Sequence, residues 1–119
     1  MTENQRTVER YLEGFRRDDH PMILACLTDD VEWVVPGAFH LRGKREFGGE
    51  IVSEGFVPPP TIEVTRMLEA SDVVYAEGFV GTRHQDGTRL RLAMCDVFEM
   101  RDGRIRKLTS YIMPAGPAA

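Results

Sequence analysis

Residues 88–101 alternate between apolar and polar side chains over the longest such stretch of the chain. A period of two residues requires a β-strand with one apolar and one polar face. Asp96 stands in the middle of the apolar face. An unpaired carboxylate in apolar surroundings is costly, so such a group raises its pKa or finds a partner. The other side chains of that face are Leu90, Leu92, Met94, Phe98 and Met100.

Two interpretations of Asp96 are open at this point. As a structural residue, it would be held by a serine, a tyrosine, a backbone amide or an arginine of another strand. As a functional residue, it would belong to the perturbed carboxyl groups that gather at active sites.

The first half of the chain carries helical patterns. Thr2 and Gln5 have the form of a capping box, and apolar residues then recur at helical spacing. Pro21 suits the start of a second, short helix. Aromatic and β-branched residues then indicate a strand, followed by a loop. The expected elements are helices over residues 3–17, about 21–27 and 43–56, a strand over 31–36 and a loop over 38–42.

From residue 61 onward the patterns are those of strands. Two Asp-Gly pairs, at residues 86–87 and 102–103, are strong hairpin signals. The expected strands cover residues 61–69, 72–83, 88–101 and 104–113, with a loose tail after them. This order predicts an α+β fold, in which three N-terminal helices pack on a curved, mostly antiparallel sheet that forms a cone around a cavity.

Composition limits the classes of function. A length of 119 residues fits one domain over 1–119, and the net charge of −4 argues against a nucleic-acid partner. The polar start and the lack of a long apolar run predict a cytoplasmic protein without a membrane segment. Cys26 and Cys95 read as free thiols, and no motif for a metal or another cofactor is present, so none is expected.

Four local stretches resemble the nuclear transport factor 2-like superfamily, in particular its ketosteroid-isomerase-like and SnoaL-like (polyketide-cyclase-like) branches. The resemblance extends from about Thr7 to Pro114. It implies a cone with a ligand site on its concave side and a homodimer packed through the outer sheet face. The superfamily includes isomerases, cyclases, hydrolases, dehydratases and binding proteins. The matching stretches are Arg10-Tyr-Leu-Glu13, Thr28-Asp-Asp-Val-Glu-Trp33, Gly43-Lys-Arg-Glu46 and residues 96–105.

The resemblance to ketosteroid isomerase implies an oxyanion hole formed by Tyr11 and a protonated Asp96. The aspartate that moves the proton in those enzymes has no match, because valines stand at positions 34 and 35. His40, close to that position, and Glu77, on a strand face shared with Phe79, are candidate substitutes.

The sequence therefore favours an enzyme without a cofactor that acts on a small apolar carbonyl, enol or epoxide compound. One alternative is a binding protein that holds a similar ligand without chemistry. Another is a dimerising domain whose own side chains fill the cavity. The expected ligand-pocket residues are Trp33, Val35, Phe47, Phe79, Met94 and Phe98.

Overall fold

A computed structural model describes residues 1–51 and 55–117. These residues form one six-stranded sheet with the strand order β2-β1-β6-β5-β4-β3. Neighbouring strands run antiparallel except β1 and β6, which run parallel. The elements are α1 (Glu3–Arg16), α2 (His20–Leu24), β1 (Leu27–Val35), β2 (Phe39–Arg42), α3 (Gly43–Ile51), β3 (Thr61–Ala70), β4 (Val73–Arg83), β5 (Arg89–Arg101) and β6 (Arg104–Pro117).

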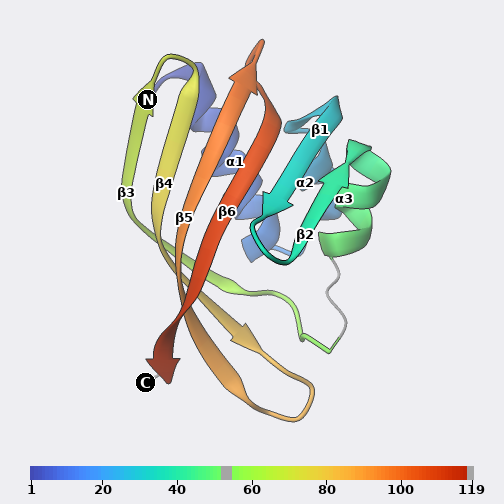
Figure 1. Ribbon diagram of the computed structural model, residues 1–119, viewed down its shortest axis with the longest axis vertical. Helices are drawn as coiled ribbons and strands as arrows, with labels where there is room; N and C mark the ends of the chain where they lie inside the picture. Colours follow the sequence, from blue (N-terminus) through green and yellow to red (C-terminus); the bar gives the residue numbers. More distant parts are fainter. Residues whose placement is uncertain (52–54, 118–119) are drawn as a thin grey trace.

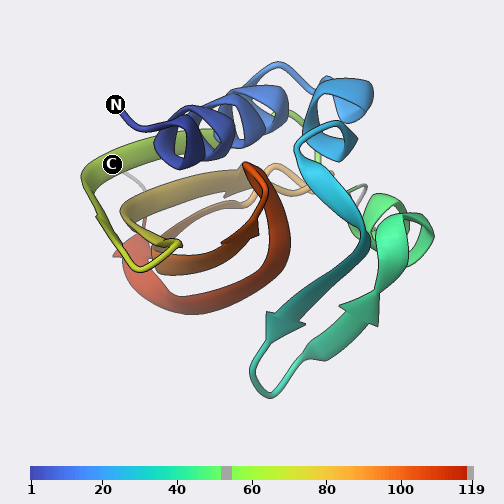
Figure 2. The same cartoon turned by 90° about the horizontal axis from the view of Figure 1, so that it is seen from above.

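The sheet is curved and unclosed, and the helices pack against it (Figure 1). Figure 2 shows α1 lying across the concave side of the long strands. The predicted α+β class is thus confirmed. Within the described ranges, no helix is long and apolar enough to span a membrane.

Helix α1 forms as its sequence predicts. Thr2 caps it by accepting a hydrogen bond from the Gln5 backbone, and the Gln5 side chain completes the capping box. The helix buries Val8, Tyr11 and Leu12, which recur at the spacing of one helical face. That face lies on the sheet and places Tyr11 over its concave side.

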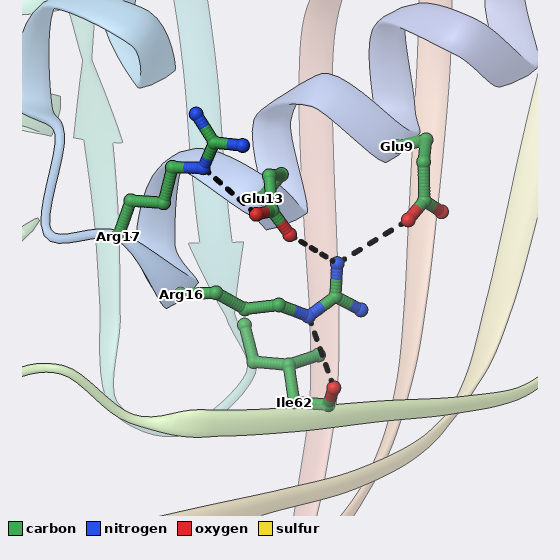
Figure 3. Close-up of polar contacts among 5 residues, drawn as sticks. All are labelled: Glu9, Glu13, Arg16, Arg17 and Ile62. Carbon is green, nitrogen blue, oxygen red and sulfur yellow. Dashed lines mark hydrogen bonds and ion pairs between the residues drawn. The ribbon is translucent and has the colours of Figure 1, made fainter.

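Arg16 ties the end of α1 to strand β3 (Figure 3). Its Nε donates to the Ile62 carbonyl at 3.1 Å, while Nη1 contacts Glu9 and Glu13 at 3.2 Å each. Because β3 is the edge strand, its outward carbonyl groups need partners from outside the sheet. The guanidinium group supplies one and holds β3 beneath the helix.

Gly78 allows two strands to approach closely where the sheet curls. A Cβ atom at this position would lie 1.9 Å from the Glu63 carbonyl oxygen. The pairing of β3 with β4 also shifts between Val64 and Arg66, which is the mark of a bulge. Bulges bend and twist the strands that contain them, so this region shapes the concave face.

The turn at Asp102-Gly103 forms where its Asp-Gly signal predicts a hairpin. Ser71 and Asp72 join β3 to β4, and Asp102 and Gly103 join β5 to β6, all four with positive φ. Two successive residues with positive φ form the turn whose twist suits a tight hairpin. Thr7 donates to the Gly103 carbonyl at 2.7 Å and fixes the last turn against α1.

Five expected boundaries were wrong. Helix α2 ends at Leu24, so Cys26 and Leu27 lie outside the helix in which they were expected. Residues 39–42 form β2, because they pair with β1 instead of forming a loop. Strand β1 begins at Leu27, four residues early, since Leu27 already pairs with Ile105. Helix α3 ends at Ile51; residues 52–54 of the expected helix lie outside the described residues, and Phe56 forms a bridge with His84. Strand β6 continues to Pro117 where a loose tail was expected, and residues 118–119 are not described.

Candidate functional site

A cavity of about 330 Å³ lies between α1, β1, β2 and the concave face of the sheet. Aliphatic side chains from β5 and β6 form much of its floor. Such a mostly apolar concavity with few polar groups is typical of small-molecule sites. Its aromatic lining consists of Tyr11, Phe15, Trp33, Phe39 and Phe56.

Asp96 lines this cavity from β5. It pairs with Ala76 of β4 on one side and Ser110 of β6 on the other. Burial raises the pKa of its carboxyl group from 3.8 to about 6, although the Ser110 hydroxyl donates a hydrogen bond that favours the charged form. The carboxyl group therefore lies in apolar surroundings, as the strand pattern predicts.

Ser110 connects Asp96 to Trp33. The indole Nε1 of Trp33 donates to Ser110 Oγ at 3.1 Å. Because the serine oxygen accepts this bond, its own proton is available for the Asp96 carboxylate. The Trp33 indole fixes the position of Ser110 next to the carboxyl group, and the burial of Ser110, which is 2% exposed, keeps this contact away from bulk water.

Tyr11 lines the same cavity and is held by aromatic contacts. Its ring meets the rings of Phe15 and Phe98 edge-on, with centroids 5.1 and 5.4 Å apart. Burial, then the nearby charge of Asp96, raises the pKa of the Tyr11 hydroxyl well above its ordinary value. Tyr11 therefore stays protonated and can act as a hydrogen-bond donor at neutral pH.

The two candidate substitutes for the missing base lie elsewhere. His40 faces away from the cavity on β2, where its Nε2 contacts Glu32 Oε1 at 2.8 Å. Glu77 lies on the outer face of the sheet and forms an ion pair with Arg66 at 3.1 Å. Neither residue lines the cavity. The structure thus separates both from Asp96.

The inward face of β4 was assigned wrongly. Phe79 and Glu77 lie on the outer face, because Ala76 pairs with Asp96 and must share its side of the sheet. Val74 and Ala76 are fully buried. Hydrophobicity alone predicts that the large apolar residues of this strand are the buried ones. The strand instead turns its small residues inward, where α1 packs.

The other expected pocket residues divide into two groups. Trp33, Val35 and Met94 line the cavity. Phe47 and Phe98 are fully buried beneath it, where Phe47 stacks on Trp33 with a centroid distance of 4.6 Å. Those two residues support the wall and do not form it.

Sequence reasoning missed Ser110 and Phe39. The alternation around Ser110 could have revealed that it shares a face with Leu108, which is buried. Phe39 was missed because residues 39–42 have the sequence pattern of a loop. The centroid of its ring lies 5.3 Å from that of Trp33. No group of three or more metal-ligating side chains lies together in residues 1–51 and 55–117.

The raised pKa of Asp96 predicts a specific dependence of stability on pH. The folded protein binds this proton more tightly than the unfolded chain, in which the pKa is near 3.8. The contribution of this proton to the free energy of unfolding is thus complete below pH 3.8, and it is lost as the pH rises to about 6. Against Asp96→Asn, which does not titrate, wild type should lose about 2–3 kcal/mol of unfolding free energy across this window.

Urea unfolding of both proteins at a series of pH values measures this difference, and the background titration of other groups cancels between them. A difference that stays constant with pH would show that the carboxyl group is not buried as described.

Solved structures with the same fold include a protein from M. tuberculosis described as an LEH-like epoxide hydrolase. It shares 24% sequence identity over 93% of this chain and 83% of that chain, with a TM-score of 0.83. TerC, co-crystallised with polyporic acid, shares 21% identity over 94% and 92% of the two chains, with a TM-score of 0.85.

A nuclear transport factor 2-like protein of unknown function from Burkholderia pseudomallei has a TM-score of 0.87 at 21% identity, over 95% of this chain and 92% of that one. At these identities the likeness establishes the fold. The search of curated proteins found no match.

The family model for the SnoaL-like domain matches residues 8–108. This range includes the part of α1 that carries Tyr11, the strand with Asp96 and most of the sheet. The chain belongs to the SnoaL-like domain family.

Proposed function

We propose that this protein is an enzyme that acts without a cofactor on a small, mostly apolar carbonyl, enol or epoxide compound. Asp96 transfers the proton, and Tyr11 donates a hydrogen bond to the oxygen that gains negative charge. The observation that carries the proposal is a carboxyl group with a pKa of about 6 in the wall of an apolar cavity.

A pKa near neutral pH suits proton transfer in both directions. The carboxylate accepts a proton from a carbon next to a carbonyl group or from a water molecule, and the resulting acid returns it later in the cycle. This assignment gives Asp96 the role of the base, because His40 and Glu77 lie outside the cavity. Tyr11, which remains protonated, stabilises the enolate or the opening epoxide oxygen throughout.

The named activity of one structural neighbour supports this range of substrates. The M. tuberculosis protein is described as an epoxide hydrolase. The fold alone does not decide between reactions, because one scaffold supports many activities. The choice of substrate class here depends on the cavity lining and on Asp96.

A second candidate is a binding protein that holds such a ligand without chemistry. The contact between Ser110 and Asp96 favours it, because a carboxyl group with a hydrogen-bond partner also fits a purely structural role. Ser110 in turn accepts from Trp33, so the side chain next to the Asp96 carboxyl group is itself held in place.

Ligand binding and turnover separate these candidates. Substituted phenols, which mimic enolates, should raise the melting temperature of wild type more than cyclohexanols of the same size. The shift should fall in Tyr11→Phe and disappear in Asp96→Asn. With steroidal and smaller ketones and epoxides as substrates, Asp96→Asn should lower kcat by about 100-fold or more.

Recovery of a tightly bound ketone or epoxide in unchanged form would favour the binding protein. Equal phenol shifts in wild type and Asp96→Asn would contradict both the acid–base role and the site.

We further propose that the protein forms a homodimer through the outer face of the sheet. Large apolar side chains are exposed there, with Tyr111 at 54% and Met113 at 65% exposure. Leu68 and Tyr75 lie opposite each other on the same face. Such a patch marks an interaction surface.

A second copy of this chain is the partner that best fits the outer face. Two ion pairs within the chain, Arg66 with Glu77 and Arg106 with Glu99, offset part of its charge, and the Arg91 guanidinium group lies over the Phe79 ring at 3.8 Å from its centroid. The face therefore attracts a charged partner only weakly. An apolar surface can instead pack against the same surface of a second copy across a two-fold axis.

Sedimentation of wild type at micromolar concentration should give the mass of a dimer, and Tyr111→Arg should give a monomer. Leu90→Arg serves as the control, because Leu90 is also exposed but belongs to the other face of β5. A monomeric wild type, or a dimer that survives Tyr111→Arg, would rule out this interface.

A further inference from the structure

Several partly exposed aromatic rings reach the cavity that Asp96 lines. The planes of two of them, Trp33 and Phe39, stand at 85° to each other, with centroids 5.3 Å apart. The faces of aromatic rings carry partial negative charge and attract cations, most strongly where water is excluded. The lining therefore suits a positively charged group as well as an apolar one. The rings that line the cavity and keep accessible surface are those of Phe15, Trp33, Phe39 and Phe56.

Asp96 places a negative charge close to these rings. The residue is partly exposed and lines the same cavity. Trp33 Nε1 donates to Ser110, and Ser110 lies directly opposite Asp96 in the pairing of β5 with β6. With a pKa of about 6, the carboxyl group is mostly ionised at neutral pH. A ligand in the cavity can therefore reach both an aromatic ring and a carboxylate.

The counter-charge of Asp96 does not come from the described part of the chain. Burial and a hydrogen bond from Ser110 account for its pKa, and no lysine, arginine or histidine of residues 1–51 and 55–117 lines the cavity. A neutral ligand that displaced water from the carboxylate would favour its protonated form. A cation beside it would favour the charged form.

The floor of the cavity restricts the kind of cation that fits. It consists of apolar side chains, among them Leu92, Met94 and Ile112. A primary ammonium group has three N–H donors, which would lose hydrogen bonds to water that this floor cannot replace. A tertiary ammonium group has a single N–H, which the carboxylate can accept. A quaternary ammonium group has none, and its alkyl groups can pack on an apolar floor.

We propose that the cavity is a binding site for a quaternary or tertiary alkylammonium group, which packs against Trp33 and Phe39 and pairs with the Asp96 carboxylate. This class of ligand goes beyond the neutral substrates of the proposed function. Because both kinds of ligand would occupy the space beside Asp96, an alkylammonium compound should compete with a neutral substrate.

Matched ligands test the effect of charge alone. We would measure by calorimetry the binding of choline and of longer trimethylammonium alcohols, each beside the uncharged alcohol in which carbon replaces the nitrogen. At about pH 8 the charged member of a pair should bind about tenfold more tightly. Equal affinities throughout the series, or no measurable binding of any trimethylammonium compound, would overturn the inference.

The dependence of affinity on pH identifies the carboxyl group, because a quaternary ammonium group does not titrate. Between about pH 8 and about pH 5 the affinity for the charged ligand should fall about tenfold, since protonation of Asp96 removes the carboxylate. The uncharged alcohol should bind equally well or better at the lower pH. Other titratable groups that line the cavity or contact its lining are Tyr11, Asp18, Glu50 and His84, whose ring lies 4.2 Å from that of Phe56.

Substitutions separate the two halves of the site. Asp96→Asn keeps the shape of the side chain, and it should remove both the preference for the charged ligand and the dependence of its affinity on pH. Phe39→Leu keeps an apolar side chain, and it should weaken the binding of the charged ligand several-fold more than that of the alcohol. Asp18→Asn and His84→Gln are the controls, and both should bind the two ligands as wild type does.

The outcomes separate this inference from the proposed function. A charge preference that survives Asp96→Asn, or that either control removes, would assign the selectivity to another group and overturn the inference. Phenol binding and turnover that depend on Asp96, without any preference for the charged ligands, would leave the proposed function standing and overturn the inference alone.

Discussion

The placement of one partly buried carboxyl group on the concave face of the sheet governs the arrangement of this site. Asp96 lies between Ala76 and Ser110, with α1 packed over that part of the sheet. Burial disfavours the charged form of the carboxyl group, while the Ser110 hydroxyl favours the charged form. The pKa of about 6 is the net result of these two effects. Without Ser110 and the Trp33 indole behind it, the carboxyl group would be neutral over a wider pH range and less able to accept a proton.

The shape of the sheet gives this carboxyl group its surroundings. Gly78 lets β3 and β4 approach where the sheet curls, and Arg16 holds the edge strand β3 against α1. The resulting concavity has an aromatic side, formed by α1, β1 and β2, and an aliphatic floor on the long strands. A polar group placed in such a cavity interacts more strongly with a ligand than it would in water, because the local dielectric constant is low.

Period-two alternation placed Asp96 on the inner face, and helical spacing placed Tyr11 above it, so the centre of the site was predictable from local patterns. The residues around that centre depend on how strands pair, which local patterns do not determine. Strand β4 shows this, because its small residue Ala76 lies on the buried face whereas its aromatic residues lie on the outer face. His40 was misplaced because a short edge strand resembles a loop, and Ser110 was missed because its role depends on two neighbouring strands.

The most direct test of the central claim is a carbon-13 NMR titration of the Asp96 side-chain carboxyl group, with its signal assigned from the spectrum of Asp96→Asn. A buried carboxyl group that is poised for proton transfer should titrate with a pKa of about 6. A pKa near the ordinary 3.8 would mean that the carboxyl group is solvated or fully paired, and would contradict its role as the proton-transfer group.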